Sequence, residues 1–348
     1  MEKTLLILPS NLQYAPYAAH YLDVLISQPN EYEVLYWDRF NLNENSIWIR
    51  YEDKKIGHQR SFLDYIKFFN FAKKICRKNN YKKIIVFGVQ LAFFFSNFLK
   101  ENYKGRYVCD VRDYHILSNL FNFNDFIKSA NFVAISSPGF LDWLPQSSNY
   151  KICHNLPNNF SKITSLTEIS TEKPLIISYI GSLRDYHLHS SFANEISNSN
   201  NLYLKFHGDG TINKSLKIFL AKNKIKNAAV ENKYHPDDEF TLYQRSSIIN
   251  SLIPTSGINN TTLLPNRLYR SALSKRPLLS LKGTKTSNII HKHQIGLVLE
   301  KISGCEDHII KYMNNLDTDK LSINCENFIS ESAAENAKFR QHLINFLN

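Results

Sequence analysis

Glycine and cysteine are scarce in this sequence, and each shortage weighs against a class of protein. Of 348 residues only 11 are glycine and five are cysteine. The segment after the first apolar run, LPSNLQYAPY, has no glycine, so the G-x-G-x-x-G fingerprint of dinucleotide-binding enzymes is missing there. No G-x-x-x-x-G-K-[ST] phosphate loop occurs, and the cysteines form no C-x-x-C pair. A nicotinamide dehydrogenase, a P-loop ATPase, a zinc site and a disulfide framework are all disfavoured, and a reducing compartment is expected.

Long apolar runs are also missing. The most apolar stretch, IIVFGVQLAFFFSNFL at 84–99, includes Gly, Gln, Ser and Asn, and it is shorter than the roughly 20 apolar residues that a membrane span needs. The apolar part of MEKTLLILPSN is too short for a signal peptide. We therefore expect a cytoplasmic protein in which 84–99 forms a buried strand and a buried helix.

Acidic residues are few where basic residues gather. The chain carries a formal net charge of +11, and residues 54–83 hold ten Lys and Arg against the single acid Asp64. A helix expected over 61–79 interleaves its lysines with five aromatic residues: Phe62, Tyr65, Phe68, Phe69 and Phe71. This pattern favours peripheral docking on an anionic membrane, with a solvated helix face as the alternative. No nucleic-acid-binding motif accompanies it, so a nucleic-acid partner is not expected.

Short apolar runs alternate with helix-period segments through both halves, which is typical of an α/β protein with parallel sheets. The strands expected in the first half are 4–9, 33–37, 83–88, 106–111, 131–136 and 150–155. Those expected in the second half are 174–181, 202–208, 227–233, 248–254, 277–281 and 296–300. The polar, aperiodic stretch 156–173 reads as a linker. We expect doubly wound Rossmann-like domains at 1–160 and 174–330, facing each other across a ligand cleft, and a closing helix at 331–348.

Two strands of the second half end in glycine-containing loops. In YIGSLRDYH, Gly181 and Ser182 follow a buried strand, and Arg184 could form a bidentate pair with phosphate. KFHGDGT repeats the design with His207, Gly208 and Asp209. Glycine at such positions lets backbone approach a ligand, although an ordinary strand-to-helix turn remains the alternative.

The segment TTLLPNRLYRSALSKRP at 261–277 places arginines where a helix is expected to begin. A cation at that end opposes the helix dipole, and an anion bound over the helix start would reverse the cost. The amides of Thr261, Thr262, Leu263 and Leu264 would surround such an anion. Spacing puts Asn266, Arg267 and Arg270 on one face of the helix.

These motifs, in the order YIGSLRDY, FHGDG, TTLLPNRLYRSALSKRPLL and KGTKTSNIIHKHQIGLVL, resemble the C-terminal domain of GT-B-fold glycosyltransferases. The closest likeness is to family-4-type enzymes of bacterial capsule and lipopolysaccharide synthesis. KIIVFG, CDVRDYH, FVAISSPGF and YKICHNLPN fall where that family places strands of its acceptor domain. The chain departs at one point: the family's pair of glutamates is replaced by Thr262 and Arg270. The second glutamate normally holds the ribose, so the resemblance leaves the donor and the mode of ribose binding open in this chain.

The resemblance implies that the anion is the pyrophosphate of a nucleotide sugar, with a UDP-sugar as the expected donor and no separate cofactor. Arg267 or Arg184 would neutralise the leaving diphosphate, so no metal is expected. In the first domain, Asp113 and His115 follow a core strand and would activate or orient the acceptor. Asp110 and Arg112 either share that role or form a structural ion pair. The loops 9–11 and 136–139 would line the acceptor side.

The remaining candidates for metal binding are weak. The Asp-x-Asp of LDTDK at 316–320 is expected to be a solvated loop. His187, His189, His291 and His293 lack further ligands at zinc-like spacing and are expected at the surface.

The expected function is transfer of a sugar, as by a hexosyltransferase, from a nucleoside-diphosphate sugar to a surface-glycan acceptor. The acceptor would be lipid-linked, and the reaction would occur at the inner face of the plasma membrane. An epimerase or hydrolase of the same fold is one alternative. A catalytically degenerate partner subunit of a transferase is the other.

Overall fold

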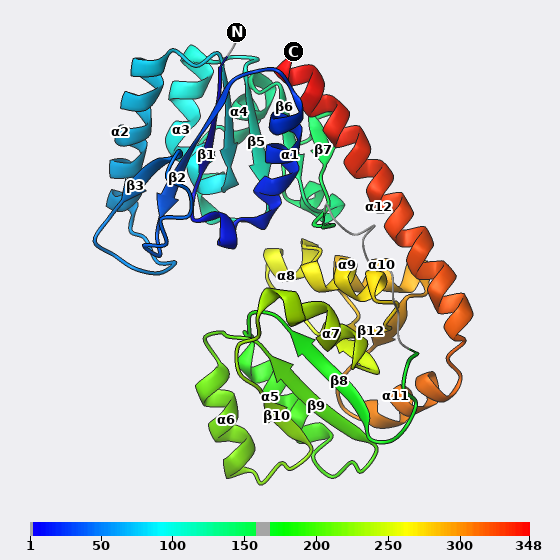
Figure 1. Cartoon of the computed structure of the whole chain (residues 1–348). Coiled ribbons are helices and arrows are strands. Elements are labelled where there is room, and N and C mark those ends of the chain that lie inside the picture. The colour runs from blue at the N-terminus through cyan, green and yellow to red at the C-terminus, as the bar shows by residue number, and fades with distance from the viewer. Residues whose placement is uncertain (1–2, 158–167) are drawn as a thin grey trace. The chain divides into compact units, whose positions relative to one another are not determined.

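The computed structural model describes residues 3–157 and 168–348 and contains two compact units (Figure 1). Unit 1 comprises Met1–His154 with Ala334–Asn348, and unit 2 comprises Asn155–Ala333. Each unit is built on one parallel sheet, which confirms the predicted α/β class with two doubly wound folds. Most of the predicted linker, 158–167, lies outside the described residues.

The sheet of unit 1 has seven strands in the order β3-β2-β1-β4-β5-β6-β7, all parallel. The strands are β1 Thr4–Leu8, β2 Tyr32–Asp38, β3 Ile49–Glu52, β4 Lys83–Phe87, β5 Tyr107–Val111, β6 Phe132–Ile135 and β7 Tyr150–Ile152. β1, β4, β5 and β6 are buried along their whole length, which explains why their sequences are apolar apart from Thr4, Lys83 and Asp110. Only β3 was not predicted, because IRYE is short and polar.

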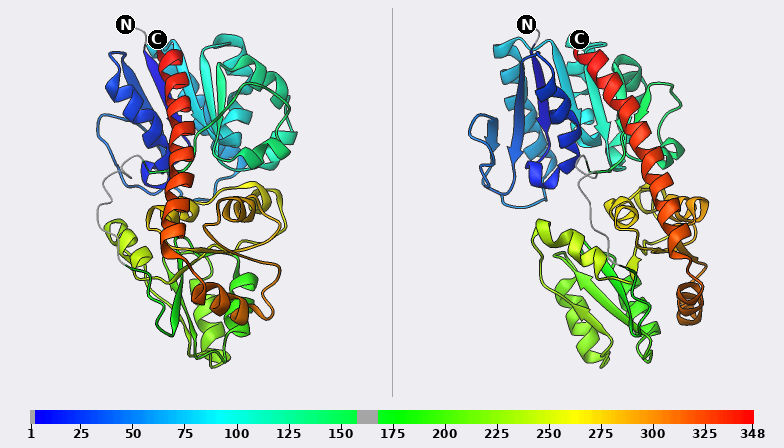
Figure 2. Two further views of the ribbon diagram at one scale, coloured as in Figure 1. Left: turned by 90° about the vertical axis from the view of Figure 1, so that its right-hand side faces the viewer. Right: turned by 45° about the vertical axis from the view of Figure 1, so that its right-hand side comes forward.

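Helices cover both faces of the unit 1 sheet (Figures 1 and 2). The helices are α1 Ala19–Ser27, α2 Phe62–Asn79, α3 Gly88–Asn102 and α4 Phe123–Ser129, with 3₁₀ turns at Leu12–Tyr14, Pro16–Ala18, Ile116–Asn119 and Pro138–Asp142. Tyr21 and Leu25 of α1 share one core cluster with Phe339 and Leu343 near the chain end. A capping box between Ser61 and Asp64 starts α2 where the sequence predicted it.

Unit 2 has a six-stranded parallel sheet in the order β10-β9-β8-β11-β12-β13. The strands are β8 Leu175–Ile180, β9 Leu202–His207, β10 Ala228–Val230, β11 Ile248–Asn250, β12 Leu278–Leu281 and β13 Gly296–Leu299. All six were predicted. β8 and β11 sit side by side at the point where the strand order reverses, and doubly wound folds bind ligands at the carboxyl ends of such strands.

The helices of unit 2 also form two layers. They are α5 Tyr186–Glu195, α6 Asn213–Lys222, α7 Glu239–Gln244, α8 Ile258–Thr262, α9 Asn266–Leu273, α10 Lys285–His293 and α11 Cys305–Asn314, with a 3₁₀ turn at Pro236–Asp238. α5, α6 and α11 contribute to one core cluster, through side chains such as Phe192 and Leu216. α9 and α10 contribute to another, through Leu268 and Ile290.

The last helix, α12 Thr318–Leu347, begins 13 residues before the predicted closing helix. Its first turns place Leu321 and Phe328 in a core cluster of unit 2, whereas Phe339 and Leu343 pack in unit 1. The Asp317 carboxylate accepts the amide of Lys320 at 2.9 Å. LDTDK was predicted to be a loop and is instead the beginning of this helix, because Asp317 serves as its cap.

Candidate active site

In unit 2 the loops that follow β8 and β9 run against each other through their backbones. The Gly181 amide donates to the His207 carbonyl at 3.0 Å, and the Leu183 amide donates to the Asp209 carbonyl at 3.2 Å. Gly181 and Gly208 have φ values of 127° and 130°. A Cβ on Gly208 would lie 2.1 Å from the Gly181 carbonyl oxygen. Gly208 is therefore required for the two loops to approach, and the positive φ of Gly181 favours glycine there as well.

The polar side chains on these two loops remain accessible. Ser182, Arg184 and Asp209 are exposed. One oxygen of the Asp209 carboxylate already accepts a hydrogen bond from the Gly210 amide at 2.9 Å. His207 is half-buried, and burial lowers its pKa. At neutral pH this imidazole is therefore uncharged and can donate or accept a hydrogen bond to a neutral ligand group.

Between β11 and α9 the chain makes a short helical turn, α8, and then an extended step. The amides of Thr261 and Leu263 donate to the carbonyls of Gly257 and Asn259, and the Thr262 hydroxyl donates to Ile258. Leu263 and Leu264 are buried. Since two of the predicted anion-binding amides already bond within the turn, the first turn of α9, around Asn266 and Arg267, becomes the main source of unpaired amides.

Arg267 is buried and is held in place by two contacts. It is only 8% exposed, its guanidinium carbon lies 3.6 Å from the centroid of the Tyr179 ring, and its Nη1 donates to the Asn250 carbonyl at 3.4 Å. A buried cation needs compensation, and a ring face and one carbonyl provide it here, with no carboxylate ion pair to Arg267 among the described residues. The site therefore presents fixed positive charge at the start of α9.

His189, on α5, lies beside this arginine. The predicted surface position is wrong for His189, which is fully buried against Tyr179 and Phe206. Neither ring nitrogen has a hydrogen-bond partner within the part of the chain that the structure describes. Burial, with the charge of Arg267 adding to it, lowers the pKa of His189 to about 3. The imidazole is neutral at every physiological pH, so the positive charge at this place belongs to Arg267 alone.

Further buried polar atoms gather at the carboxyl end of the central strands. Asn250, at the end of β11, is completely buried, and its Oδ1 accepts the Leu252 amide at 3.0 Å. Asn250 Nδ2 and the hydroxyls of Ser251 and Ser280 have no partner among the described residues. Buried donors without partners mark a place where a polar ligand or water is needed. The sequence signal was present, as an Asn-Ser pair that ends a buried apolar strand, but it was missed.

Arg270 has a partner that the sequence did not indicate. Its Nη2 lies 3.2 Å from the Glu239 carboxylate at the start of α7. Tyr234 reaches the other oxygen of the same carboxylate at 3.5 Å. Asn266, on the same helix, is exposed. The position where this chain departs from the glycosyltransferase pattern is thus part of an ion pair between α7 and α9.

In unit 1 the structural alternative for Asp110 and Arg112 is confirmed. Both are buried, and Arg112 Nη2 donates to Asp110 Oδ2 at 2.6 Å, while its Nε bonds the other oxygen. Tyr21 donates to the same carboxylate at 2.6 Å, and Arg112 also donates to the Cys153 carbonyl at 2.8 Å. This bidentate, fully supported pair joins β5 to α1 and to the end of β7, so its role is structural.

Asp113 and His115 follow the same strand but differ in what they can do. Asp113 is exposed and His115 is half-buried. His115 Nδ1 accepts the Leu117 amide at 3.3 Å, and burial lowers its pKa. In a neutral imidazole the nitrogen opposite an accepting one carries the proton. Nε2 of His115 is therefore a hydrogen-bond donor, and Asp113 is the better candidate for a base.

The predicted acceptor loops of unit 1 are firmly built. Asn11 Nδ2 donates to Asp38 at 2.7 Å, and its Oδ1 accepts the Phe40 amide. In the second loop the Ser137 hydroxyl accepts the Gly139 amide at 3.1 Å. Ser10 is the one polar group of these two loops that is buried and lacks a partner, among the described residues.

No cluster of three or more His, Cys, Asp or Glu that could hold a metal ion occurs among the described residues. Nor does any helix in the described ranges combine the length and the apolar character that a bilayer crossing requires. His187 and His291 are exposed, as predicted, and His293 is half-buried against Phe328.

No protein-family profile and no characterised sequence matches this chain. Its structure, however, is similar to solved structures over nearly the whole length. One is a sucrose-phosphate synthase from Thermosynechococcus elongatus, with a TM-score of 0.74 at 9% identity, covering 98% of both chains. Another is HepE from Anabaena in complex with UDP and glucose, with a TM-score of 0.67 at 12% identity, covering 97% of both chains.

The same architecture also occurs in a UDP-N-acetylglucosamine 2-epimerase from Rickettsia bellii, with a TM-score of 0.64 at 10% identity, covering 100% of this chain and 97% of that one. Identities this low show the fold alone, and the fold is GT-B, as the sequence resemblance implied. Activity has to be argued from the site.

Proposed function

We propose that this protein is a metal-independent glycosyltransferase that moves a sugar from a nucleoside-diphosphate sugar to a surface-glycan acceptor. A UDP-sugar is the proposed donor. The observation that carries the proposal is Arg267, a buried cation stacked on Tyr179 at the start of α9. Arg267 belongs to unit 2, where Asn250, Ser251 and Ser280 carry buried donors that have no partner among the described residues. Doubly wound folds bind ligands at this edge of the sheet, at the carboxyl ends of the central strands.

The chemistry follows from where negative charge develops. When the bond between the sugar and the diphosphate breaks, the leaving group gains charge, and a positioned cation stabilises it without reorganising. Arg267 is fixed by its ring and carbonyl contacts, and Arg184 is exposed on the neighbouring loop and can move to the phosphate. The first-turn amides of α9 add the positive end of a helix dipole.

Glycines and neutral polar groups would hold the rest of the donor. Gly181 and Gly208 leave the backbone without side chains directly after β8 and β9, so it can approach a ligand placed there. His207 and Asp209 lie at the end of β9, and the neutral His207 suits a hydroxyl or a base edge. Because Arg270 stands where the related enzymes carry a carboxylate, its pairing with Glu239 brings a carboxylate to the same face of α9.

For the acceptor, we propose Asp113 of unit 1 as the base that takes the proton from the attacking hydroxyl. His115 would orient the acceptor through the Nε2 proton. Such a step needs a carboxylate within hydrogen-bond reach of the hydroxyl, so an exposed aspartate on a loop after a core strand is suited to it.

The acceptor is proposed to be lipid-linked, with unit 1 touching the membrane. Phe62 at the start of α2 is 54% exposed and packs against Phe94 of α3 at 4.8 Å between ring centroids. Leu63, Ile116 and Leu120 are each more than 60% exposed. We name Phe62, Leu63, Ile116 and Leu120 the apolar rim. The other aromatic residues of α2 do not join it. Phe68 is buried, and Tyr65, Phe69 and Phe71 are only half-exposed, unlike Phe62.

Basic side chains continue along α2 from this rim. Lys67, Lys74, Arg77 and Lys78 are exposed, and their spacing places them on one face. Apolar side chains next to a basic stripe are the combination that binds anionic interfaces, with the protein lying on the bilayer.

The test of the donor is calorimetric titration of the full chain with UDP, GDP and CDP, followed by incubation with the sugar nucleotide of the base that binds. Saturable binding of one nucleotide, with Arg267→Ala weakening it, supports the proposal. Absence of binding by all three nucleotides refutes it.

An epimerase is the second candidate, because the fold is shared with one. Proton NMR of the UDP-sugar incubated without any acceptor distinguishes the two. A transferase leaves the sugar nucleotide intact or releases free sugar slowly, whereas an epimerase produces a new sugar nucleotide. Tight nucleotide binding with neither reaction would indicate a degenerate partner subunit.

A further inference from the structure

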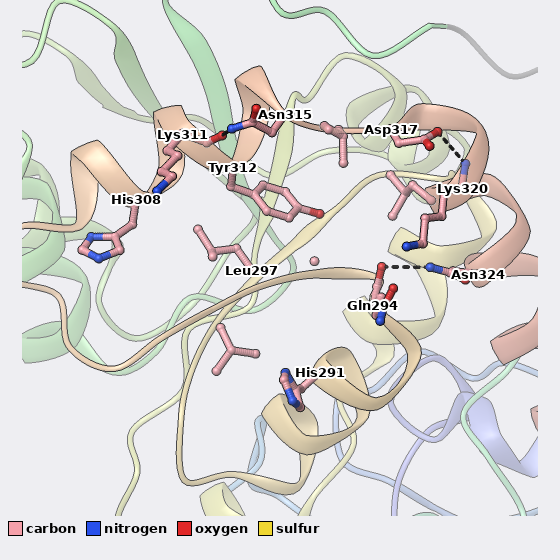
Figure 3. Close-up of a pocket in the computed structure, with 14 residues that line it drawn as sticks. His291, Gln294, Leu297, His308, Lys311, Tyr312, Asn315, Asp317, Lys320 and Asn324 are labelled. Carbon is pink, nitrogen blue, oxygen red and sulfur yellow. Dashed lines mark hydrogen bonds between the residues drawn. The ribbon is translucent and has the colours of Figure 1, made fainter.

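Unit 2 contains a cavity of about 770 Å³ that lies along β13, the edge strand of its sheet (Figure 3). α10 ends on one side of the cavity, α11 borders another, and the first turn of α12 closes the third. Gly296, Leu297 and Val298 of β13 line the cavity directly. The residues proposed to hold the donor do not line it, so this is a separate feature of the unit.

The backbone groups of β13 that face the cavity can be assigned from its pairing with β12. The Leu278 and Lys282 amides donate to the carbonyls of Ile295 and Leu299. In a strand, alternate residues turn their backbone groups to opposite sides, so Leu297 also faces β12 while Gly296 and Val298 face away from it. No hydrogen bond from elsewhere in the described chain reaches either of those two residues.

Gly296 confirms this geometry in a second way. A Cβ at this position would lie 2.1 Å from the Leu278 carbonyl oxygen. The Cα of Gly296 therefore points at β12, which leaves its N–H and C=O directed outward. The free backbone N–H and C=O groups of an edge strand are normally covered or protected from pairing with another chain. Beside β13, however, these groups border a cavity.

The cavity walls are apolar in the middle, and their polar positions combine two lysines with two histidines, three side-chain amides, a tyrosine hydroxyl and one carboxylate. Leu297, Val298, Leu316 and Leu321 and the ring of Tyr312 supply the apolar part. Figure 3 shows the Tyr312 hydroxyl directed toward the centre, with Lys311 and Lys320 at opposite ends of the view. The lining also includes His291 and His308, and its one carboxylate, Asp317, already caps α12.

We propose that this groove binds an extended, acidic peptide segment of a partner protein, which adds as a further parallel or antiparallel strand beside β13. The outward groups of Gly296 and Val298 supply main-chain hydrogen bonds, which give affinity in strand addition. Alternate side chains of the peptide enter the apolar part of the groove. Carboxylates of the peptide meet Lys311 and Lys320, which select an acidic sequence. This binding does not depend on sugar transfer.

The test is selection of a phage-displayed library of random 12-residue peptides on the full-length protein, followed by anisotropy titration of the enriched peptides. Val298→Pro removes an outward N–H without removing a bond to β12, and we expect it to weaken binding at least about tenfold. The matched control is Val230→Pro on β10. There the amide of Leu204 donates to Asn227 and that of Glu231 to Phe206, so Val230 also faces outward. This control edge should bind like the wild type.

A second variant guards against misfolding of the proline variant. Lys311 and Lys320 are exposed, so the double change Lys311→Glu and Lys320→Glu leaves the core intact. This double variant should bind the enriched acidic peptides at least about tenfold more weakly than the wild type does. Higher salt should also weaken the binding of these peptides to the wild type. The proposal fails if no peptide is enriched. It also fails if the enriched peptides bind the charge-reversed variant as well as the wild type, or bind both proline variants equally.

Discussion

The guanidinium of Arg267 rests on the ring of Tyr179, with 3.6 Å between its central carbon and the ring centroid. Tyr179 is in β8, two residues before Gly181, and Arg267 is in the first turn of α9. A residue in the strand that ends in the glycine loop therefore fixes the cation at the helix start. This contact connects the two motifs that the sequence singled out separately.

Replacing Arg267 by Ala should weaken binding of the donor nucleotide by roughly 1.5–3 kcal/mol, the contribution of a charge-assisted hydrogen bond. Arg184→Ala should have an effect of the same sign. Arg245, an exposed arginine at the end of α7, provides the matched control, and Arg245→Ala should bind normally. Calorimetric titration measures all three, and wild-type affinity in both the Arg267 and the Arg184 variant would show that the phosphates lie elsewhere.

Arg270→Glu should reduce both stability and donor binding. It replaces an ion pair by two facing carboxylates, and because Arg270 is about two-fifths exposed the stability loss should stay near 1 kcal/mol or below. Urea unfolding measures the stability, and nucleotide titration measures the binding. The double variant Arg270→Glu with Glu239→Arg restores the pair in reverse. If it recovers stability but binding stays weak, Arg270 serves the donor directly; if it recovers both, Arg270 acts only through the pair.

Turnover should survive EDTA. The charge on the leaving diphosphate is proposed to be met by Arg267, Arg184 and helix amides, so chelation should leave the rate unchanged. The assay is release of the nucleoside diphosphate with and without chelator, after which Mn²⁺ or Mg²⁺ is added back. Loss of activity that either metal reverses would contradict this prediction.

Acidification should destabilise unit 2 through His189. Its pKa in the folded chain is about 3, below the ordinary value of 6.5, because of burial and the charge of Arg267. The unfolded chain therefore takes up a proton below pH 6.5 that the folded chain does not. The contribution of His189 to the free energy of unfolding is therefore fully present above pH 6.5, and it falls by about 1.4 kcal/mol per pH unit toward pH 3.

His189→Phe should remove this dependence, since a phenyl ring suits the apolar site beside Phe206 and has no nitrogen to leave unpaired. Denaturant unfolding between pH 7 and pH 5 measures it, with the exposed His187→Ala as control. Some slope should remain, because burial and Arg112 lower the pKa of His20 in unit 1 to about 3 as well. An unchanged slope in His189→Phe would show that His189 is already protonated in the folded state.

Phe62→Ser combined with Leu63→Ser should reduce flotation of the protein with vesicles of anionic phosphatidylglycerol. Two exposed apolar side chains of the apolar rim are removed, so the loss should be severalfold. Ile218→Ser, at a residue 57% exposed in unit 2, is the matched control. Lys67→Glu should add to the effect at low salt. If the double serine variant floats as well as the wild type, the apolar rim does not touch the membrane.

All strands of the two sheets except β3 were predictable, because the apolar run that indicates a buried strand is a local pattern in the sequence. Buried parallel strands have to be apolar along their length, and runs such as IIVF and LIIS admit few other structures. β3 was missed for the same reason, since a short polar edge strand has no such run. The start of α2 could be predicted because its capping box, Ser61 and Asp64, lies within four consecutive residues. The early start of α12 was not recognised, because its cap, Asp317, was interpreted as part of a loop.

Sequence alone determined the fold class, the two glycine loops and the location of Arg267 at a helix start. Only the tertiary structure decided what each charged group faces. His189 and Arg267 are far apart in the chain, yet folding packs both against Tyr179. Burial and the charge of Arg267 keep His189 neutral, and the Tyr179 ring helps to hold Arg267 as a fixed cation. Arg270 pairs with Glu239 because folding placed the two side chains within reach. For the neighbouring Asp110 and Arg112, the folded structure decided between the two roles that the sequence left open. Ionisation and pairing depend on burial and on distances between chain segments, and these quantities exist only once the chain is folded.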